Sequence, residues 1–161
     1  MDTVVKRSWR TLPEVCFLLL FGFNPQYMTL GNAQELKGPF LDDRPAKLEM
    51  FFKSYNCPQP YYIDHYLSAA DSYSLDYRFL PAVSVRESTC GAHTRLNNHW
   101  GWDNGRSGFR SVKSGIYFVT SRLAYGEYYR GKSLDEKILM YNPDPQYVRE
   151  IKTLMRQIDA D

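Results

Sequence analysis

Glu87 is the residue in this sequence whose surroundings best suit acid–base chemistry. It follows the largely apolar residues 81–85 and precedes Cys90. Burial disfavours the charged form of a carboxyl group, so we expect Glu87 to be partly desolvated and to keep its proton near neutral pH. A protonated carboxyl group can donate its proton to a leaving oxygen, which is what a glycosidase requires. The alternative is an ordinary helix glutamate that pairs with an arginine such as Arg86.

A second carboxylate is common in glycoside cleavage, and Asp103 is the best-placed candidate. It lies in the segment Gly-Trp-Asp-Asn at 101–104, in the same loop as the predicted substrate contacts. The alternative is an Asx turn in which Asp103 only holds the loop. Glu127 is a weaker candidate. The acetamido oxygen of an N-acetyl sugar can also act as the nucleophile, and then no second carboxylate is needed.

Aromatic residues make up 16% of the chain, with 13 tyrosines. Aromatic rings stack on sugar faces, but they also fill small helical cores. Trp100, Trp102 and Phe109 are the loop residues that are candidates for sugar stacking, and the alternative is that they cover the core. The histidines do not have the spacing of metal ligands, so we expect no metal and no other cofactor.

The hydrophobic pattern predicts an all-α domain of about six helices that positions these residues. Residues 92–110 show no sustained periodicity and are expected to form a long loop, a feature that is usually functional in a compact domain. Gly91 is expected to close the third helix in a left-handed conformation. The expected helix starts are marked by capping residues or prolines, at Asp42 and Asp43, Asp64, Leu80 with Pro81, Ser111, Ser133, and Asp144.

Residues 1–33 have the layout of a secretory signal peptide, with a basic start, an apolar run at 15–23 and small residues before Ala33. The run is shorter than the ~20 residues that span a bilayer. The alternatives are an uncleaved anchor and a start codon placed too early. Cleavage after Ala33 leaves one domain, 34–161, which we expect to be secreted or periplasmic without stable insertion in a membrane.

Removal of the signal peptide leaves two cysteines, Cys57 and Cys90. An even number in an exported chain predicts a disulfide, which stabilises a domain of this kind by roughly 3–4 kcal/mol. The competing interpretation is two free thiols in a cytoplasmic protein. The formal net charge of +2 is too small to indicate a nucleic-acid partner, and nothing in the sequence requires more than a monomer.

Three short blocks carry a resemblance to a known family. They read Glu-Ser-Thr-Cys-Gly at 87–91, Asn-Asn-His-Trp-Gly at 97–101 and Tyr-Asn-Pro-Asp-Pro-Gln-Tyr at 141–147. In this order and spacing they resemble the glucosaminidase-type (family 73) branch of the lysozyme-like peptidoglycan hydrolases. The resemblance covers roughly residues 62–158.

The resemblance implies a lysozyme-like fold and an endo-β-N-acetylglucosaminidase that acts on the glycan strands of peptidoglycan. Glu87 matches the catalytic acid of the family. Tyr141 and Tyr147 match two positions in the late block, one of which assists the chemistry. Asn98 matches the loop residue that shapes the floor of the groove. The residues expected to contact the substrate are Asn98, Trp100, Trp102 and Ser88.

Two alternatives stay open at the level of sequence. The bond cut can be that of a muramidase or a lytic transglycosylase instead of a glucosaminidase. The chain can also be a non-catalytic, lysozyme-like protein that binds cell wall through the same aromatic groove.

Overall fold

The computed structural model describes residues 42–160, so the expected signal peptide at 1–33 lies outside the described residues. These residues belong to the second of two units into which the chain divides, residues 39–161. They contain six α-helices, one short 3-10 turn and no strand. The expected all-α class with six helices is therefore confirmed. No helix within 42–160 is both long and apolar enough to cross a bilayer.

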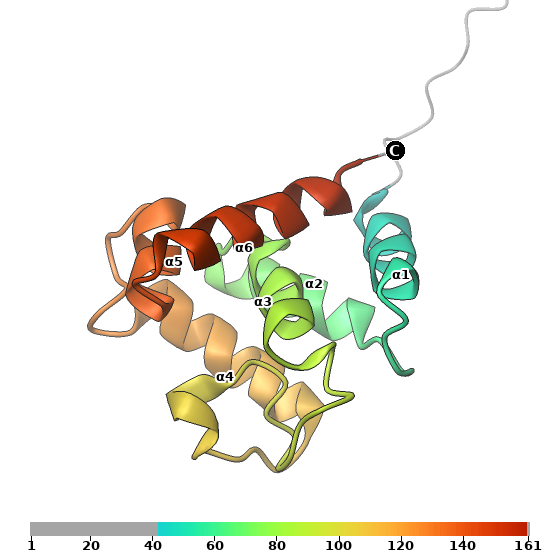
Figure 1. Cartoon of the computed structure of the whole chain (residues 1–161), viewed down its shortest axis with the longest axis horizontal. Helices are drawn as coiled ribbons and strands as arrows, with labels where there is room; N and C mark the ends of the chain where they lie inside the picture. Colours follow the sequence, from blue (N-terminus) through green and yellow to red (C-terminus); the bar gives the residue numbers. More distant parts are fainter. Residues whose placement is uncertain (1–41, 161) are drawn as a thin grey trace, which may run out of the picture. The chain divides into compact units, whose positions relative to one another are not determined.

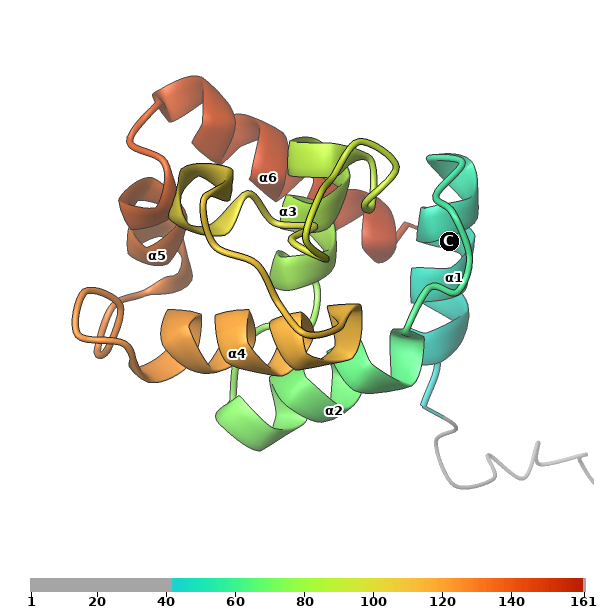
Figure 2. The ribbon, with the colours of Figure 1, turned by 90° about the horizontal axis from the view of Figure 1, so that it is seen from below.

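Figure 1 shows the order of the elements along the chain. The helices are α1 (Arg44–Ser54), α2 (Ile63–Tyr73), α3 (Phe79–Ser88), α4 (Val112–Tyr125), α5 (Leu134–Tyr141) and α6 (Pro145–Ile158), and the 3-10 turn η1 is Trp102–Gly105. The long loop lies between α3 and α4, as expected, and Figure 2 shows it running from the end of one helix to the start of the other.

Three helix starts are made by the capping residues that the sequence indicates. Ser111 accepts a hydrogen bond from the backbone N–H of Ser114 at 3.1 Å and opens α4. Ser133 opens α5 in a capping box with Glu136. Asp144 accepts from the N–H of Gln146 and opens α6, with a proline at the first helical position. Each cap satisfies a backbone donor that has no partner inside its helix.

Two other expected helix ends are wrong. Asp64 does not cap α2, because the helix begins one residue earlier and its N-cap is Tyr62 in a left-handed conformation. Gly91 does not close α3, because Thr89 already takes the left-handed conformation at φ 49°. The chain turns there because the N–H of Cys90 bonds to the carbonyl oxygen of Ser84 at 2.9 Å. Left-handed conformations are uncommon for residues with a Cβ, so sequence patterns rarely indicate them.

The start of α1 is capped in part as expected. Asp43 occupies the N-cap position but its side chain makes no capping bond. Asp42 accepts a bond from the N–H of Arg44 at 3.1 Å. The side chain of Asp42 also accepts from the guanidinium of Arg44, which reaches on to Asp71 in α2.

α3 is the helix around which the others pack. Its residues 79–85 are all buried, and a helix that is buried all round must be covered by neighbours on every side. α6 packs against α3, and α2 packs against α4 (Figures 1 and 2). The expected disulfide is present between Cys57 and Cys90, whose Cα atoms are 5.4 Å apart. It joins the segment after α1 to the start of the loop that follows α3.

Candidate active site

The loop that follows α3 is organised around the buried side chain of Asn98. Its Nδ2 donates to the carbonyl oxygens of Trp102 at 2.9 Å and Ser107 at 2.8 Å, and its Oδ1 accepts from the N–H of Trp102 at 3.0 Å. Only 4% of Asn98 is exposed. Its polar atoms are therefore committed to the loop, and Asn98 shapes the loop instead of facing a ligand.

Ser88 clamps the same loop to the end of α3. Its hydroxyl donates to the carbonyl oxygen of His99 at 2.6 Å and accepts from the N–H of Gly91 at 2.8 Å. Ser88 is buried, so in this structure it holds the loop and does not contact a substrate. The sequence could not separate these roles, because a serine hydroxyl suits both.

The two loop tryptophans, Trp100 and Trp102, differ in how deeply they are buried. Trp100 is fully buried, and its ring packs edge-on against Tyr66 and Phe109. The expectation that Trp100 stacks on a sugar is therefore wrong for this structure, and it belongs to the core. Trp102 is half-buried and lies close to the rings of Tyr129 and Tyr141.

The Glu87 carboxylate lies directly against the backbone of Gly101. A Cβ atom added to Gly101 would sit 2.9 Å from Glu87 Oε2, and the φ of this glycine is +63°. Glycine is the residue that tolerates both the conformation and the close approach. The loop thus brings its backbone, with no side chain, up to the carboxylate.

Glu87 is exposed, so the expectation that neighbouring apolar residues bury it is wrong. The buried stretch of α3 ends at Val85, and both following residues face outward. The loop packs on Ser88 instead, and Gly101 offers no side chain to cover the carboxylate. The adjacent arginine does not neutralise Glu87 by an ion pair: Arg86 is bound to Glu150 of α6 at 2.5 Å.

Two stacked tyrosines, Tyr141 and Tyr147, are influenced by the charge of this carboxylate. The rings of Tyr141 and Tyr147 are stacked, with centroids 6.2 Å apart. Burial, and next the charge of Glu87, raise the pKa of both phenols well above the usual value.

The two hydroxyl groups have different partners. Tyr141 donates to the carbonyl oxygen of Trp100, which ties α5 to the loop. The hydroxyl of Tyr147 is buried and has no hydrogen bond of acceptable geometry within residues 42–160, although it lies near the Glu87 carboxylate. Tyr147 is therefore the phenol with a proton still to donate, and Tyr141 is the one that reaches the surface.

A cleft of about 380 Å³ opens beside this group. Gly101, which lies against Glu87, is part of its wall, and so is Tyr141. The complete lining is Gly101, Trp102, Asp103, Asn104, Ser107, Tyr128, Tyr129 and Tyr141. The predicted residues Trp102, Asp103 and Tyr141 are thus brought together at one cleft, with Glu87 at its edge.

Asp103 is an exposed carboxylate on the rim of the cleft. It accepts from the Ser107 hydroxyl at 2.9 Å and forms an ion pair with Arg106 at 3.0 Å. The Ser107 bond, and then the bond from Arg106, lower the pKa of Asp103. Asp103 is thus ionised at neutral pH, as a nucleophile or stabilising carboxylate must be, and it also holds the loop.

Lys137 is a contributor that sequence reasoning missed. It is buried, and its ammonium donates to the carbonyl oxygens of Leu123 at 2.6 Å, Ala124 at 3.3 Å and Tyr129 at 2.8 Å. It thereby satisfies the end of α4 and fixes Tyr129 in the cleft wall. Burial lowers the pKa of Lys137. Its only signal in the sequence is a lysine next to the core residue Ile138.

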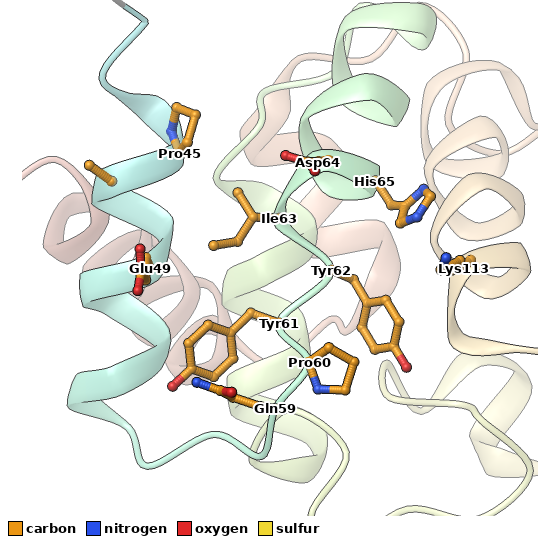
Figure 3. Close-up of a pocket in the computed structure, with 11 residues that line it drawn as sticks. Pro45, Glu49, Gln59, Pro60, Tyr61, Tyr62, Ile63, Asp64, His65 and Lys113 are labelled. Carbon is orange, nitrogen blue, oxygen red and sulfur yellow. The ribbon is translucent and has the colours of Figure 1, made fainter.

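A larger groove, of about 800 Å³, lies elsewhere, between α1 and the start of α2. Figure 3 shows that Tyr61 and Tyr62 point to opposite sides of the chain, so they do not form one stacking platform. Its glutamate, Glu49, is paired with Lys53 at 2.6 Å. Volume alone therefore does not identify the site, and we place the candidate site at the smaller cleft because Glu87 adjoins it.

No group of three or more metal-ligating side chains occurs within residues 42–160. The chain matches no protein-family model, no curated protein and no solved structure. A function for the cleft must therefore rest on its geometry and on the three sequence blocks.

Proposed function

We propose that the chain is a secreted, lysozyme-like peptidoglycan hydrolase, acting as an endo-β-N-acetylglucosaminidase with Glu87 as its general acid. The observation that carries the proposal is the position of the Glu87 carboxylate. It lies against the backbone of Gly101, which is one of the residues that line the cleft. The assignment to lysozyme-like enzymes and to peptidoglycan is supported by the sequence blocks at 87–91, 97–101 and 141–147.

In the proposed reaction Glu87, which is exposed, takes up a proton from solvent and gives it to the glycosidic oxygen as the bond from that oxygen to C1 breaks. Positive charge develops on the sugar ring in the transition state. The glycine backbone lets a sugar approach the carboxyl group without a steric barrier. Tyr147 has a buried hydroxyl with no other partner, and it is placed to orient the Glu87 carboxylate by donating to it.

The positive charge that develops at C1 must be stabilised by a negative group or a nucleophile on the face of the sugar opposite the leaving oxygen. Asp103, ionised and on the same cleft, is one candidate. The other is the acetamido oxygen of the substrate, which attacks C1 to close a ring that water then opens. Trp102 and Tyr129 present aromatic surface in the cleft on which a sugar face can stack.

The engagement of Asp103 by Arg106 and Ser107 favours a second candidate, a non-catalytic protein that binds cell wall. In that case Asp103 only shapes the rim. The cleft then holds a glycan strand without cutting it.

One experiment separates the two. The purified chain and its Glu87→Gln variant are incubated with isolated sacculi, and the products are reduced with borohydride and identified by mass spectrometry. Loss of a general acid lowers turnover by about 10²- to 10⁴-fold. Reduced N-acetylglucosamine ends identify a glucosaminidase, reduced muramic acid ends a muramidase, and anhydro ends a lytic transglycosylase.

The matched control is Glu49→Gln, which removes an exposed carboxylate from the larger groove. It should leave turnover unchanged. Sacculi bound but not cut by the unaltered chain would support the wall-binding candidate. Full turnover by Glu87→Gln would refute Glu87 as the acid.

A further inference from the structure

A second pocket, of about 240 Å³, adjoins the candidate cleft. The two share three aromatic residues, Trp102, Tyr128 and Tyr129. A strand seated in the cleft therefore has a neighbouring space on the other side of an aromatic wall. The remaining lining residues of the second pocket are Arg122, Gly126 and Glu127.

Gly126 accounts for the shape of this pocket. Its N–H donates to the carbonyl oxygen of Arg122 at 2.8 Å, and a Cβ at Gly126 would lie 2.5 Å from that oxygen. Without a side chain there, the chain turns back sharply at the end of α4. Tyr128 and Tyr129 follow this turn and line the pocket.

Arg122 brings a positive charge to the pocket. Its side chain stacks on an aromatic ring but forms no ion pair with a carboxylate of the described residues. Its guanidinium lies over the ring of Phe118, 5.2 Å from the centroid, and that ring meets Trp102 edge-on at 6.1 Å. Across residues 42–160, no carboxylate forms an ion pair with Arg122. Stacking on a ring reduces the freedom of the side chain, so less entropy is lost when it binds an anion.

Glu127 is the other charged group of the pocket, and it is exposed. The pocket thus offers the planar group of N–H donors of Arg122 and the carboxylate acceptor of Glu127. An arginine fork recognises a carboxylate with two parallel hydrogen bonds. A carboxylate acceptor suits an amide N–H or an ammonium group.

We propose that this pocket binds the carboxylate-bearing side group of a glycan strand, and that Arg122 determines specificity for such strands over neutral ones. The inference rests on the proposed function only in that it takes a glycan strand to occupy the cleft. In peptidoglycan the carboxylate has two sources: the lactyl group of a sugar without a peptide, and the peptide where one is attached to that lactyl group. Arg122 then acts on binding and not on bond cleavage.

The test measures the dissociation constants of three probes with the full chain, in a Glu87→Gln background so that nothing is cut. The probes are neutral N-acetylglucosamine oligomers, glycan strands with free lactyl carboxylates, and strands that keep their peptides. Arg122→Met keeps most of the side-chain length but removes the charge. Arg95→Met, an exposed arginine that lines neither pocket, is the matched control.

We expect Arg122→Met to weaken the binding of carboxylate-bearing strands about tenfold, the equivalent of one charged hydrogen bond, and to leave neutral oligomers within about twofold. Arg122→Lys should restore part of the loss, because it keeps the charge without the fork. An effect on peptide-bearing strands alone assigns the peptide carboxylate. An effect on strands with free lactyl carboxylates alone assigns the lactyl group. An equal effect on both acidic probes shows that the pocket accepts either carboxylate.

Equal weakening of neutral and acidic probes by Arg122→Met would overturn the inference, because Arg122 would then only support Phe118. A chain without preference for acidic strands would overturn it as well. If the chain prefers acidic strands in the binding test but does not cut sacculi, only the proposed hydrolase activity is contradicted. Turnover without charge preference counts against this inference alone.

Discussion

Two adjacent parts of the long loop, residues 98–100 and residues 102–105, have opposite surroundings. Asn98 and Trp100 are buried and join the loop to the core. Trp102, which is partly buried, and Asp103, which is exposed, line a cleft. Gly101 lies between them, against Glu87. The buried residues fix the position of the loop. A binding or catalytic site on a loop needs such rigid support, because its residues must be held in a precise geometry.

The two tryptophans give the largest expected contrast. Trp100→Ala should cost about 3–5 kcal/mol of unfolding free energy, because it leaves a cavity in the packed core. Trp102→Ala should cost clearly less, because its ring is only half-buried. Denaturant unfolding of both variants measures the difference. Equal losses would mean that both parts of the loop belong to the core.

The two glycines isolate the contact with Glu87. Gly101→Ala should lower turnover about 100-fold, because the new Cβ displaces a carboxylate that it would approach to 2.9 Å. Gly105 also has a positive φ, +74°, but a Cβ there meets nothing within 4 Å. Gly105→Ala should therefore cost stability without changing turnover. Similar turnover in the two variants would show that the approach to Glu87 is unimportant.

The two asparagines compare a buried side chain with an exposed one. Asn98→Ala removes three hydrogen bonds and should cost about 2 kcal/mol. Asn97 makes one bond, from Nδ2 to the carbonyl oxygen of Phe109 at 3.0 Å, and is exposed. Asn97→Ala should cost less than about 1 kcal/mol. Hydrogen exchange of the loop amides, measured on both variants, locates the loss.

The smallest expected effect concerns pH. Burial lowers the pKa of His99 below 6.5, so the unfolded chain takes up its proton at a higher pH than the folded chain. His99 therefore adds to stability above about pH 6.5, and this contribution is lost as the pH falls below that value. His99→Gln should flatten the dependence of the melting temperature on pH between about 7 and 5.

Much of the fold is readable from local patterns. Ser111, Ser133 and Asp144 cap the helices that the sequence assigns to them. A cap bonds to a backbone donor two or three residues away, so a short stretch of sequence contains the whole interaction. Prolines and apolar spacing act over the same short range. For this reason the number and order of the helices agree with expectation.

The site is less readable from local patterns. The sequence indicates Glu87, Trp102, Asp103 and Tyr141, and the structure brings these residues to one cleft and its edge. It does not indicate Lys137, whose three acceptors are backbone carbonyls that any residue provides. Nor does it distinguish Trp100 from Trp102, because both are tryptophans two residues apart in the same loop.

The sequence by itself therefore determined the helices, the pairing of Cys57 with Cys90 and a short group of residues with suitable chemistry. The tertiary structure alone decided that Trp100 is buried, that Glu87 is exposed beside Gly101, and that a half-buried tryptophan forms the wall of a cleft. The physical reason is that burial depends on neighbours far away in the chain. Capping and helical spacing depend only on neighbours close by.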